Sequence, residues 1–257
     1  MTSPRLGVVF RPQLPPEQLR PFVTSAQAAG LDDVWLWEDC FLEGGLTASV
    51  AALAWTESVR VGLGLMPVPF RNPALAAMEL ATVARLFPGR FVPAAGHGVL
   101  DWMAQVGARA ESPMTLLHEW VSAVRALLHG ETVTTSGSYV NLSGVTLDWP
   151  PSQVPPLLVG ARKPRTIALA GEIADGLVLD AGITPDGVRA AIAQAAAPRP
   201  HEVVAYLPVA GPADEMADVV RGYGEAGATT VVLQPTETAL EIGPLIGLAA
   251  ETRAKLG

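Results

Sequence analysis

The sequence predicts an α/β protein, a TIM (β/α)8 barrel, from three observations. Short apolar runs alternate eight times with segments of helical period, a pattern typical of a parallel sheet. The chain has 257 residues, close to the usual length of such a barrel, about 250. A doubly wound open sheet is the alternative, but it usually stops after about five or six units.

The strands and helices of the first half have clear boundary signals. We expect strands at 5–10, 33–37, 59–67 and 91–95, with helices at 15–29, 46–56 and 72–86. Gly30 ends the first helix. Asn72 caps the third, with Pro73 at its first position. The large apolar residues of this third helix are expected to face inward: Leu75, Met78, Leu80, Val83 and Leu86.

The same alternation returns in the second half. We expect strands at 155–160, 175–180, 201–208 and 229–234, with helices at 164–174, 185–197, 214–226 and 237–256. The interval before residue 155 is too long for one helix. It predicts a helix over 114–128 and a β-hairpin, with strands 132–134 and 139–142 around Ser136-Gly137-Ser138. We interpret these as an insertion between strands four and five of a single domain, 1–257.

Composition excludes several partners. The net charge of −8, without a basic stripe, argues against nucleic acid. No apolar stretch approaches the roughly 18 residues of a membrane span. The N-terminus shows no signal-peptide pattern, and the single cysteine, Cys40, fits a reducing cytoplasm. No histidine cluster suggests a metal site.

The third strand ends abruptly, in a way typical of a barrel's working face. Pro67 and Pro69 cannot donate ladder hydrogen bonds. Gly62 and Gly64 remove side chains where a flat or bulky group could lie against the backbone. Trp35, Trp37 and Trp102 could line an aromatic ligand, while core packing is the alternative for Trp35 and Trp37, which share one face of a strand.

The other strand ends carry the candidate chemistry, because barrel active sites lie there. Gly160-Ala161-Arg162-Lys163 precedes a helix carrying Thr166, an arrangement suited to a phosphate. Gly96-His97-Gly98 allows close backbone approach beside a histidine. Glu38-Asp39 could supply an acid or base. Each of these three motifs has an alternative interpretation. The segment 160–163 could be a plain surface loop, His97 could have a structural role, and Glu38-Asp39 could cap the following turn. Cys40 lacks a nearby histidine and is expected to be inert. Dinucleotide, P-loop and nucleophile-elbow motifs are absent from the sequence.

Several motifs together resemble the bacterial luciferase-like family of flavin- and deazaflavin-dependent oxidoreductases. They are Val61-Gly62-Leu63-Gly64-Leu65-Met66-Pro67 with Arg71-Asn72-Pro73, Ala77-Met78-Glu79-Leu80-Ala81-Thr82-Val83, Phe87-Pro88-Gly89-Arg90-Phe91, Gly96-His97-Gly98, Leu158-Val159-Gly160-Ala161 and Ala170-Gly171-Glu172-Ile173-Ala174-Asp175-Gly176. The match weakens after about residue 185.

The resemblance implies a TIM barrel, often a homodimer, that binds FMN or coenzyme F420 and acts on a small organic substrate. It places the ring near the end of strand three, with a bulge and a cis peptide near Gly64, Leu65 or Met66. Gly96, His97 and Gly98 would also contact the cofactor. The phosphate would lie at Gly160, Ala161, Arg162, Lys163 and Thr166, the anion site expected from the residues themselves.

One departure leaves the acid or base open. Many relatives carry Asp-His at the end of strand two, where this chain has Glu38-Asp39. Only Glu38, Asp39 or His97 could take that role. With FMN the expected reaction is monooxygenation, and with F420 it is hydride transfer. The alternatives are a phosphate-binding isomerase or lyase on the same fold, and a non-catalytic flavin-binding protein.

Overall fold

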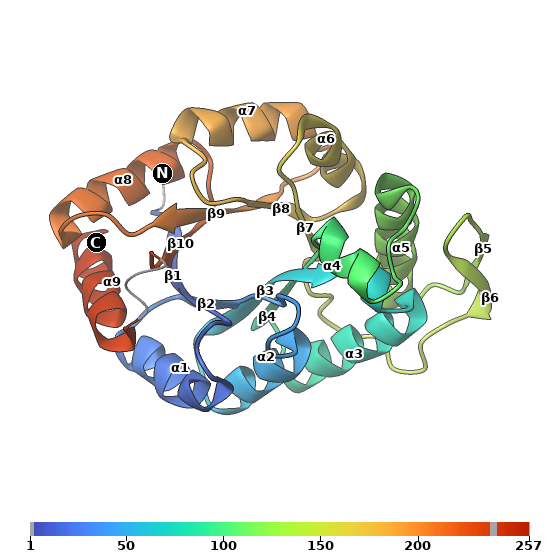
Figure 1. Ribbon diagram of the computed structural model, residues 1–257, viewed down its shortest axis with the longest axis horizontal. Coiled ribbons are helices and arrows are strands. Elements are labelled where there is room, and N and C mark those ends of the chain that lie inside the picture. The colour runs from blue at the N-terminus through green and yellow to red at the C-terminus, as the bar shows by residue number, and fades with distance from the viewer. Residues whose placement is uncertain (1–2, 237–240, 257) are drawn as a thin grey trace.

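The computed structural model describes residues 3–236 and 241–256. Within them, parallel strands close into one barrel in the order β1-β10-β9-β8-β7-β4-β3-β2, with helices around the outside (Figure 1). The register continues around the barrel, from Val8 opposite Val34 to Val8 opposite Leu233. The predicted TIM barrel is confirmed.

The barrel strands lie where the apolar runs predict them. Their bounds are β1 Arg5–Phe10, β2 Asp33–Leu36, β3 Arg60–Pro67, β4 Phe91–Gly96, β7 Leu158–Gly160, β8 Gly176–Leu179, β9 Glu202–Pro208 and β10 Thr230–Gln234. The largest difference is at β7, expected from residue 155. Pro155 and Pro156 have no N–H to donate, so the ladder begins only after them.

The helices follow the strands in turn. Their bounds are η1 Pro16–Gln18, α1 Leu19–Ala28, α2 Gly45–Ala54, η2 Val68–Phe70, α3 Pro73–Leu86, α4 Leu100–Gln105, α5 Pro113–Leu128, α6 Pro164–Ile173, α7 Pro185–Ala195, α8 Ala213–Glu225 and α9 Ile242–Leu256. The short α4 was not expected. Of the last expected helix, 237–256, residues 237–240 lie outside the described residues, and Glu241 is not helical.

The prediction that five large apolar residues of α3 face inward is wrong for three of them. Leu80 and Val83 are buried, but Leu75, Met78 and Leu86 are 48%, 57% and 64% exposed. The buried face consists largely of alanines, including Ala76, Ala77, Ala81 and Ala84. Small residues let the helix backbone approach its neighbours closely, and the large apolar side chains therefore project outward. The predicted cap is confirmed, because the Asn72 side chain accepts the Ala74 N–H at 2.9 Å.

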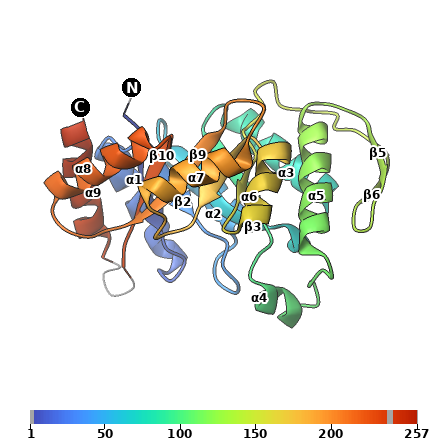
Figure 2. The same ribbon diagram turned by 90° about the horizontal axis from the view of Figure 1, so that it is seen from above.

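The segment between β4 and β7 is only partly an insertion. Helix α5 lies between α3 and α6 in the outer ring and contacts both (Figure 1), so it is the regular fourth helix of the barrel. The additional elements are α4 and the hairpin of β5 (Val133–Ser136) and β6 (Asn141–Val145), beyond α5 (Figure 2). Glu119 of α5 fixes the hairpin by accepting the N–H groups of Ser138, Tyr139 and Val140.

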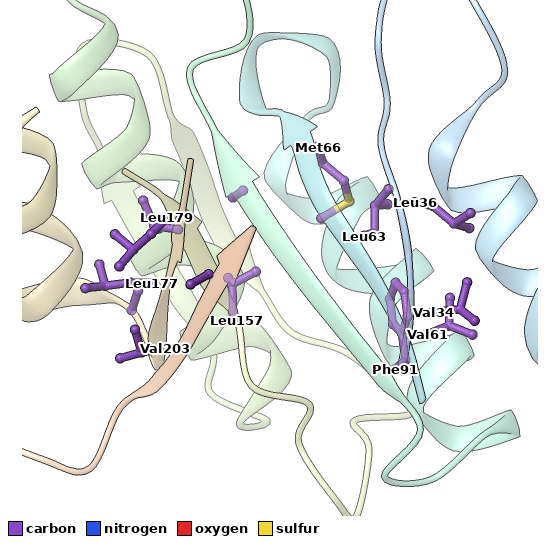
Figure 3. Close-up of a cluster of buried hydrophobic side chains, with 14 of the residues drawn as sticks. Val34, Leu36, Val61, Leu63, Met66, Phe91, Leu157, Leu177, Leu179 and Val203 are labelled. Carbon is purple, nitrogen blue, oxygen red and sulfur yellow. The ribbon is translucent and has the colours of Figure 1, made fainter. Parts of the chain in front are cut away.

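Two apolar layers lie on the two faces of the barrel strands. The outer layer packs strands against helices, and Figure 3 shows Leu36, Leu63 and Met66 within it. The inner layer fills the barrel and is built around Trp35. A Cβ added to Gly62 would lie 2.3 Å from the Trp35 ring. The flat group expected against Gly62 is therefore the protein's own indole, and core packing is the correct reading of Trp35.

The N-terminal end of the barrel is closed by paired charges. The buried Asp33 carboxylate binds Arg5 at 2.8 Å and Arg60 at 2.9 Å. Arg60 also reaches Glu202 at 3.4 Å. A buried carboxylate needs such partners, because an unpaired one costs several kcal/mol. In the described ranges 3–236 and 241–256, none of the helices is both long and apolar enough to cross a membrane.

Candidate functional site

A cavity of about 940 Å³ opens at the C-terminal ends of the strands. The expected site residues that line it are Glu38, Asp39, Gly64, Leu65, His97, Gly98, Gly160, Ala161, Arg162, Lys163 and Thr166. The structure therefore brings segments from β2, β3, β4 and β7 to one place. Two of the expected cofactor-binding residues, Met66 and Gly96, do not line it.

A bulge in β3 turns Met66 away from the cavity and places Leu65 over Gly96. The register with β4 shifts between Leu63 and Met66, and the Gly64–Leu65 peptide is cis, as the resemblance implied. Leu65 points across the mouth, while Met66 is 1% exposed and packs beside Leu63 and Leu36 in the outer layer (Figure 3). Met66 therefore faces the helices and not the cavity.

The glycines on β4 and β7 make room for the bulge. A Cβ on Gly96 would lie 2.5 Å from Leu65 Cδ2, and one on Gly160 would lie 2.3 Å from the same atom. The Leu65 side chain therefore covers Gly96 and lies against Gly160. These two residues shape the site by letting Leu65 pass, which the sequence alone did not reveal.

The N-terminus of α6 forms an anion site on one wall. The helix has no side-chain cap, its N-cap Lys163 has extended backbone, and Pro164 occupies its first turn. Uncapped N–H groups at a helix start attract anions. Arg162, Lys163 and Arg165 also line the cavity. Arg162 forms an exposed ion pair with Asp180 at 2.9 Å, so an arriving anion would compete with that carboxylate.

His97, directly after β4, faces Thr166 of helix α6. Its Nε2 lies 3.4 Å from Thr166 Oγ1. Its Nδ1 is buried and has no hydrogen-bond partner among residues 3–236 and 241–256. Burial lowers the pKa of His97, and the Pro113 backbone partly opposes that shift. The imidazole is therefore neutral near pH 7, when one ring nitrogen can still accept a proton.

Glu38 is fully engaged and is a poor candidate for proton transfer. Arg71 binds its two oxygens at 2.5 and 3.0 Å, and the Gly45 N–H donates to it at 3.0 Å. Arg71 also contacts Glu79 at 3.4 Å. The carboxylate is thus a structural anion that fixes the loop after β2, close to the capping role given above as the alternative.

Asp39 is the acid that remains available at the mouth. Burial raises its pKa, and the Arg11 charge opposes that rise. Arg11 is itself buried, lies 5.4 Å from the centre of the Trp37 ring and donates to Gln13 at 3.1 Å. Cys40 follows Asp39 in the same loop. Burial raises the pKa of its thiol, and the neighbouring Glu38 and Asp39 add to the rise, so it stays protonated and unreactive.

Sequence reasoning missed parts of the cavity wall. Tyr206 on β9 and residues 99–100 at the start of α4 line it without having been anticipated, whereas Asp180, at a strand end expected to face the site, and Trp37 and Trp102 line it as anticipated. Tyr206 lies two residues before Pro208, at the end of an apolar strand. Its position near a strand's C-terminal end was a usable signal. In the described part of the chain, no group of three or more His, Cys, Asp or Glu side chains could hold a metal.

The residues that line the cavity fit a ligand that has a flat heterocycle at one end and an anionic group at the other. The Leu65 bulge, Trp37 and Tyr206 provide apolar surface at the inner end, and the start of α6 provides N–H groups and cations at the rim. Buried polar atoms on His97 and Tyr206 have no partner in the described protein. Such atoms usually find a partner, so a ligand with acceptor or donor atoms suits them.

The sequence and the fold of the chain are both similar to those of known proteins. A family model described as luciferase-like monooxygenase matches residues 5–201. The chain is 28% identical over 242 residues to 5,10-methylenetetrahydromethanopterin reductase of Methanolobus tindarius, covering 89% of this chain and 73% of the relative. It is 30% identical over 193 residues to F420-dependent glucose-6-phosphate dehydrogenase of Microbacterium testaceum, covering 68% and 55%. A solved F420-dependent secondary alcohol dehydrogenase, in complex with an F420-acetone adduct, is 18% identical with a TM-score of 0.87, and all of both chains is covered.

Proposed function

The chain belongs to the luciferase-like monooxygenase family, and we propose on that basis that it is an oxidoreductase with a flavin-type cofactor, F420 or FMN, in the cavity at the barrel mouth. One observation carries the proposal. The same cavity is bounded by the Leu65 bulge and by the uncapped, cationic start of α6. The first offers a support for a planar ring, and the second offers a site for the phosphate that both cofactors carry.

The protein residues divide the binding between two ends. Leu65 would lie against the ring, held in place by packing over Gly96 and Gly160. Arg162, Lys163 and the first N–H groups of α6 would hold the phosphate. Thr166 can donate its hydroxyl to the same anion after giving up its weak contact with Met114, 3.6 Å away.

The bound cofactor would supply the redox chemistry, and the protein would supply orientation and a proton. Asp39 is the acid we propose for that proton, because it faces the cavity and burial favours its protonated form. His97 is the alternative residue for proton transfer, because its imidazole is neutral and its Nδ1 has no hydrogen-bond partner within residues 3–236 and 241–256. Glu38 is left out, since Arg71 holds both of its oxygens.

F420 is the first cofactor to test, because a relative at 30% identity is named for it. FMN is the second, since the family model is described as a monooxygenase and the anion site would serve either phosphate. An isomerase or lyase on the same site would need an acid such as Glu38, but Arg71 holds that carboxylate and no observation favours this alternative over redox chemistry. We do not propose it.

A homodimer in the cytoplasm completes the proposal. The outer face of α3 exposes Leu75, Met78 and Leu86, and Trp149 beside it is 72% exposed. Met78, Leu86 and Trp149 line a cavity of about 430 Å³ on this face. Contiguous apolar surface of this kind commonly marks a protein interface. Sedimentation equilibrium of the purified protein should give twice the 26.8 kDa chain mass. The free thiol of Cys40 suits a reducing compartment.

Titration with F420, FMN and riboflavin, followed by quenching of ligand fluorescence, tests the function. We expect saturable binding of F420 or FMN and weaker binding of riboflavin, which lacks the phosphate. Binding of neither phosphorylated cofactor would refute the proposal.

Replacing both Arg162 and Lys163 with alanine tests the phosphate end. Charge-assisted hydrogen bonds contribute about 1.5–3 kcal/mol when formed, less when exposed, so we expect about a tenfold rise in the FMN dissociation constant. Riboflavin affinity should not change. The matched control is Arg189→Ala, which removes an exposed arginine paired with Asp186 on α7. Equal loss for FMN and riboflavin would place the phosphate elsewhere.

A further inference from the structure

The Tyr206 hydroxyl is a buried polar group at the floor of the cavity. Tyr206 is 4% exposed, yet it lines the cavity. Its ring is held edge-on by two tryptophans, with centroid distances of 6.1 Å to Trp35 and 5.6 Å to Trp37. The hydroxyl has no hydrogen-bond partner in the parts of the chain that the structure describes. The group is thus fixed in position and unsatisfied.

The hydroxyl lies against the bulge strand. A Cβ on Gly64 would be 2.9 Å from Tyr206 Oη. The missing side chain at Gly64 therefore leaves room for the hydroxyl beside β3, immediately before the Gly64–Leu65 peptide. The nearby lining residues Leu65 and Val178 are apolar. Tyr206 Oη is therefore a polar contact available to a ligand group that lies beside Leu65 and Val178.

The phenol acts as a donor and not as a base. Burial raises its pKa, and the Asp39 charge raises it further. The Trp37 indole partly opposes the rise without reaching hydrogen-bond geometry. The hydroxyl therefore keeps its proton at neutral pH, and it can give a hydrogen bond to an acceptor.

The energetic cost of this arrangement points to a ligand. A buried hydroxyl without a partner destabilises a folded protein, and a phenylalanine would fill the same space without that cost. The inner layer around it is otherwise apolar: Val9, Trp35, Val92, Ala94, Leu158, Val178, Val204 and Val232. Packing alone therefore gives no reason for the oxygen atom. The buried Trp35 N–H also has no partner among the residues that the structure describes, but Trp35 does not line the cavity.

We propose that the Tyr206 hydroxyl donates a hydrogen bond to an acceptor atom on the ring system of the bound cofactor, at the inner end of the cavity. The inference rests on the proposed function and adds a residue to it. Tyr206 would be a binding residue for the heterocycle, separate from the phosphate contacts at α6. A ligand lacking an acceptor at that position would lose this contact.

The experiment compares Tyr206→Phe with Tyr223→Phe. Tyr223 also has a largely buried ring, but its hydroxyl donates to the Ile183 carbonyl, away from the cavity. Each variant is titrated with F420, FMN and riboflavin, the absorption spectrum of the bound ligand is recorded, and the melting temperature is measured with and without ligand.

For Tyr206→Phe we expect about a three- to tenfold rise in the dissociation constant, the effect of losing one hydrogen bond. The rise should be the same for FMN and riboflavin, because the contact is to the ring. The absorption maximum of the bound ligand should shift. The melting temperature without ligand should stay unchanged or rise by about 2–4 °C, since an unsatisfied group is removed. Tyr223→Phe should bind normally and melt lower.

Other results overturn the inference. Unchanged affinity and spectrum in Tyr206→Phe would show that the hydroxyl does not touch the ligand. A lower melting temperature without ligand, with normal binding, would assign the hydroxyl a structural role. Loss confined to FMN would place the contact at the phosphate. Failure of the wild-type protein to bind any of the three ligands would instead refute the proposed function, so the two failures are distinct.

Discussion

Strand β2 has an aspartate near each of its ends, and the two carboxyl groups lie in opposite surroundings. Asp33, at the N-terminal end of the barrel, is 0% exposed and binds Arg5 and Arg60. Asp39, beyond the C-terminal end, faces the cavity, and burial raises its pKa against the weaker opposing effect of Arg11. One strand thus carries a carboxylate held in direct ion pairs near one end and, beyond the other end, a carboxyl group whose ionisation burial disfavours.

The same contrast holds for the two ends of the whole barrel. Arg60 at the N-terminal end contacts both Asp33 and Glu202. At the C-terminal end, His97 and Tyr206 have buried polar atoms without partners in the described residues, and the start of α6 has no side-chain cap. The comparison teaches that a cluster of buried ion pairs lies at the N-terminal end, while the cavity at the C-terminal end has unpaired polar atoms in its wall, at the end where barrel enzymes bind their ligands.

The largest expected effect comes from Asp33→Asn. Removing one partner of a buried ion pair leaves the other charge poorly compensated, which costs up to about 3–5 kcal/mol. Arg60, whose side chain is 15% exposed, would be that charge, keeping only its longer contact with Glu202 at 3.4 Å. Urea unfolding should show the loss, while the fraction that remains folded should bind cofactor with unchanged affinity.

Two milder variants keep this prediction testable if Asp33→Asn does not fold. Glu202→Gln removes a partner that is 30% exposed, and Asp214→Asn removes one that is 80% exposed. Exposed pairs contribute less than about 1 kcal/mol, so the loss of stability should fall in that order. A change in cofactor affinity that parallels the loss of stability would break the separation between the two ends.

Alanine substitutions at two glycines, one at each end of the barrel, are expected to have effects of intermediate size on stability or on binding. At the N-terminal end, a Cβ on Gly176 would lie 2.2 Å from the Glu202 carbonyl oxygen, which is backbone and cannot move aside. Gly176→Ala should therefore destabilise the protein, by about 1–3 kcal/mol. At the mouth, a Cβ on Gly160 would meet the end of the Leu65 side chain, which can rotate into the cavity.

For Gly160→Ala we therefore expect a change in binding more than in stability. The displaced Leu65 would occupy ligand space, and the cofactor dissociation constant should rise about tenfold, a change of about 1.4 kcal/mol. Urea unfolding should change by less than about 1 kcal/mol. If Gly160→Ala lost stability and kept its affinity, the assignment of Leu65 to the cavity wall would be wrong.

The smallest effect is expected from Asp39→Asn. Burial raises the folded-state pKa of Asp39 above its ordinary value of 3.8, so ionisation of this group disfavours the folded state. Below pH 3.8 the variant and the wild type should be equally stable. As the pH rises through the folded-state pKa, the wild type should become slightly less stable than Asp39→Asn. Urea unfolding of both proteins at several pH values measures the difference.

A lower stability of Asp39→Asn at neutral pH would contradict this account. It would mean that Arg11 stabilises the Asp39 carboxylate by more than burial destabilises it.

The sequence was sufficient for the order of the barrel because the boundaries depend on local chemistry. Asn72 and Pro73 start α3, and Gly30 follows α1, whatever surrounds them. The buried face of α3 was not predictable in this way. Its alanines and its large apolar residues share the same helical period, and only the packing against neighbouring elements decides which of them are covered.

The site was predicted as a location and not as a set of contacts. Strand ends collect at the mouth of any barrel, which is why Asp39, His97 and Lys163 were found to line one cavity. The pairing of Glu38 with Arg71 joins residues 33 positions apart, and the fit of Trp35 to Gly62 depends on the register of β2 and β3. Tyr206 was missed because an aromatic residue in an apolar strand is typical of a core.

A crystal structure of the protein with F420, or with FMN if F420 does not bind, tests the central claim most directly. We predict that the ring lies against Leu65 within hydrogen-bond distance of Tyr206 Oη, and that the phosphate contacts the first N–H groups of α6. A cofactor bound outside the cavity, or a phosphate held away from α6, would contradict the account.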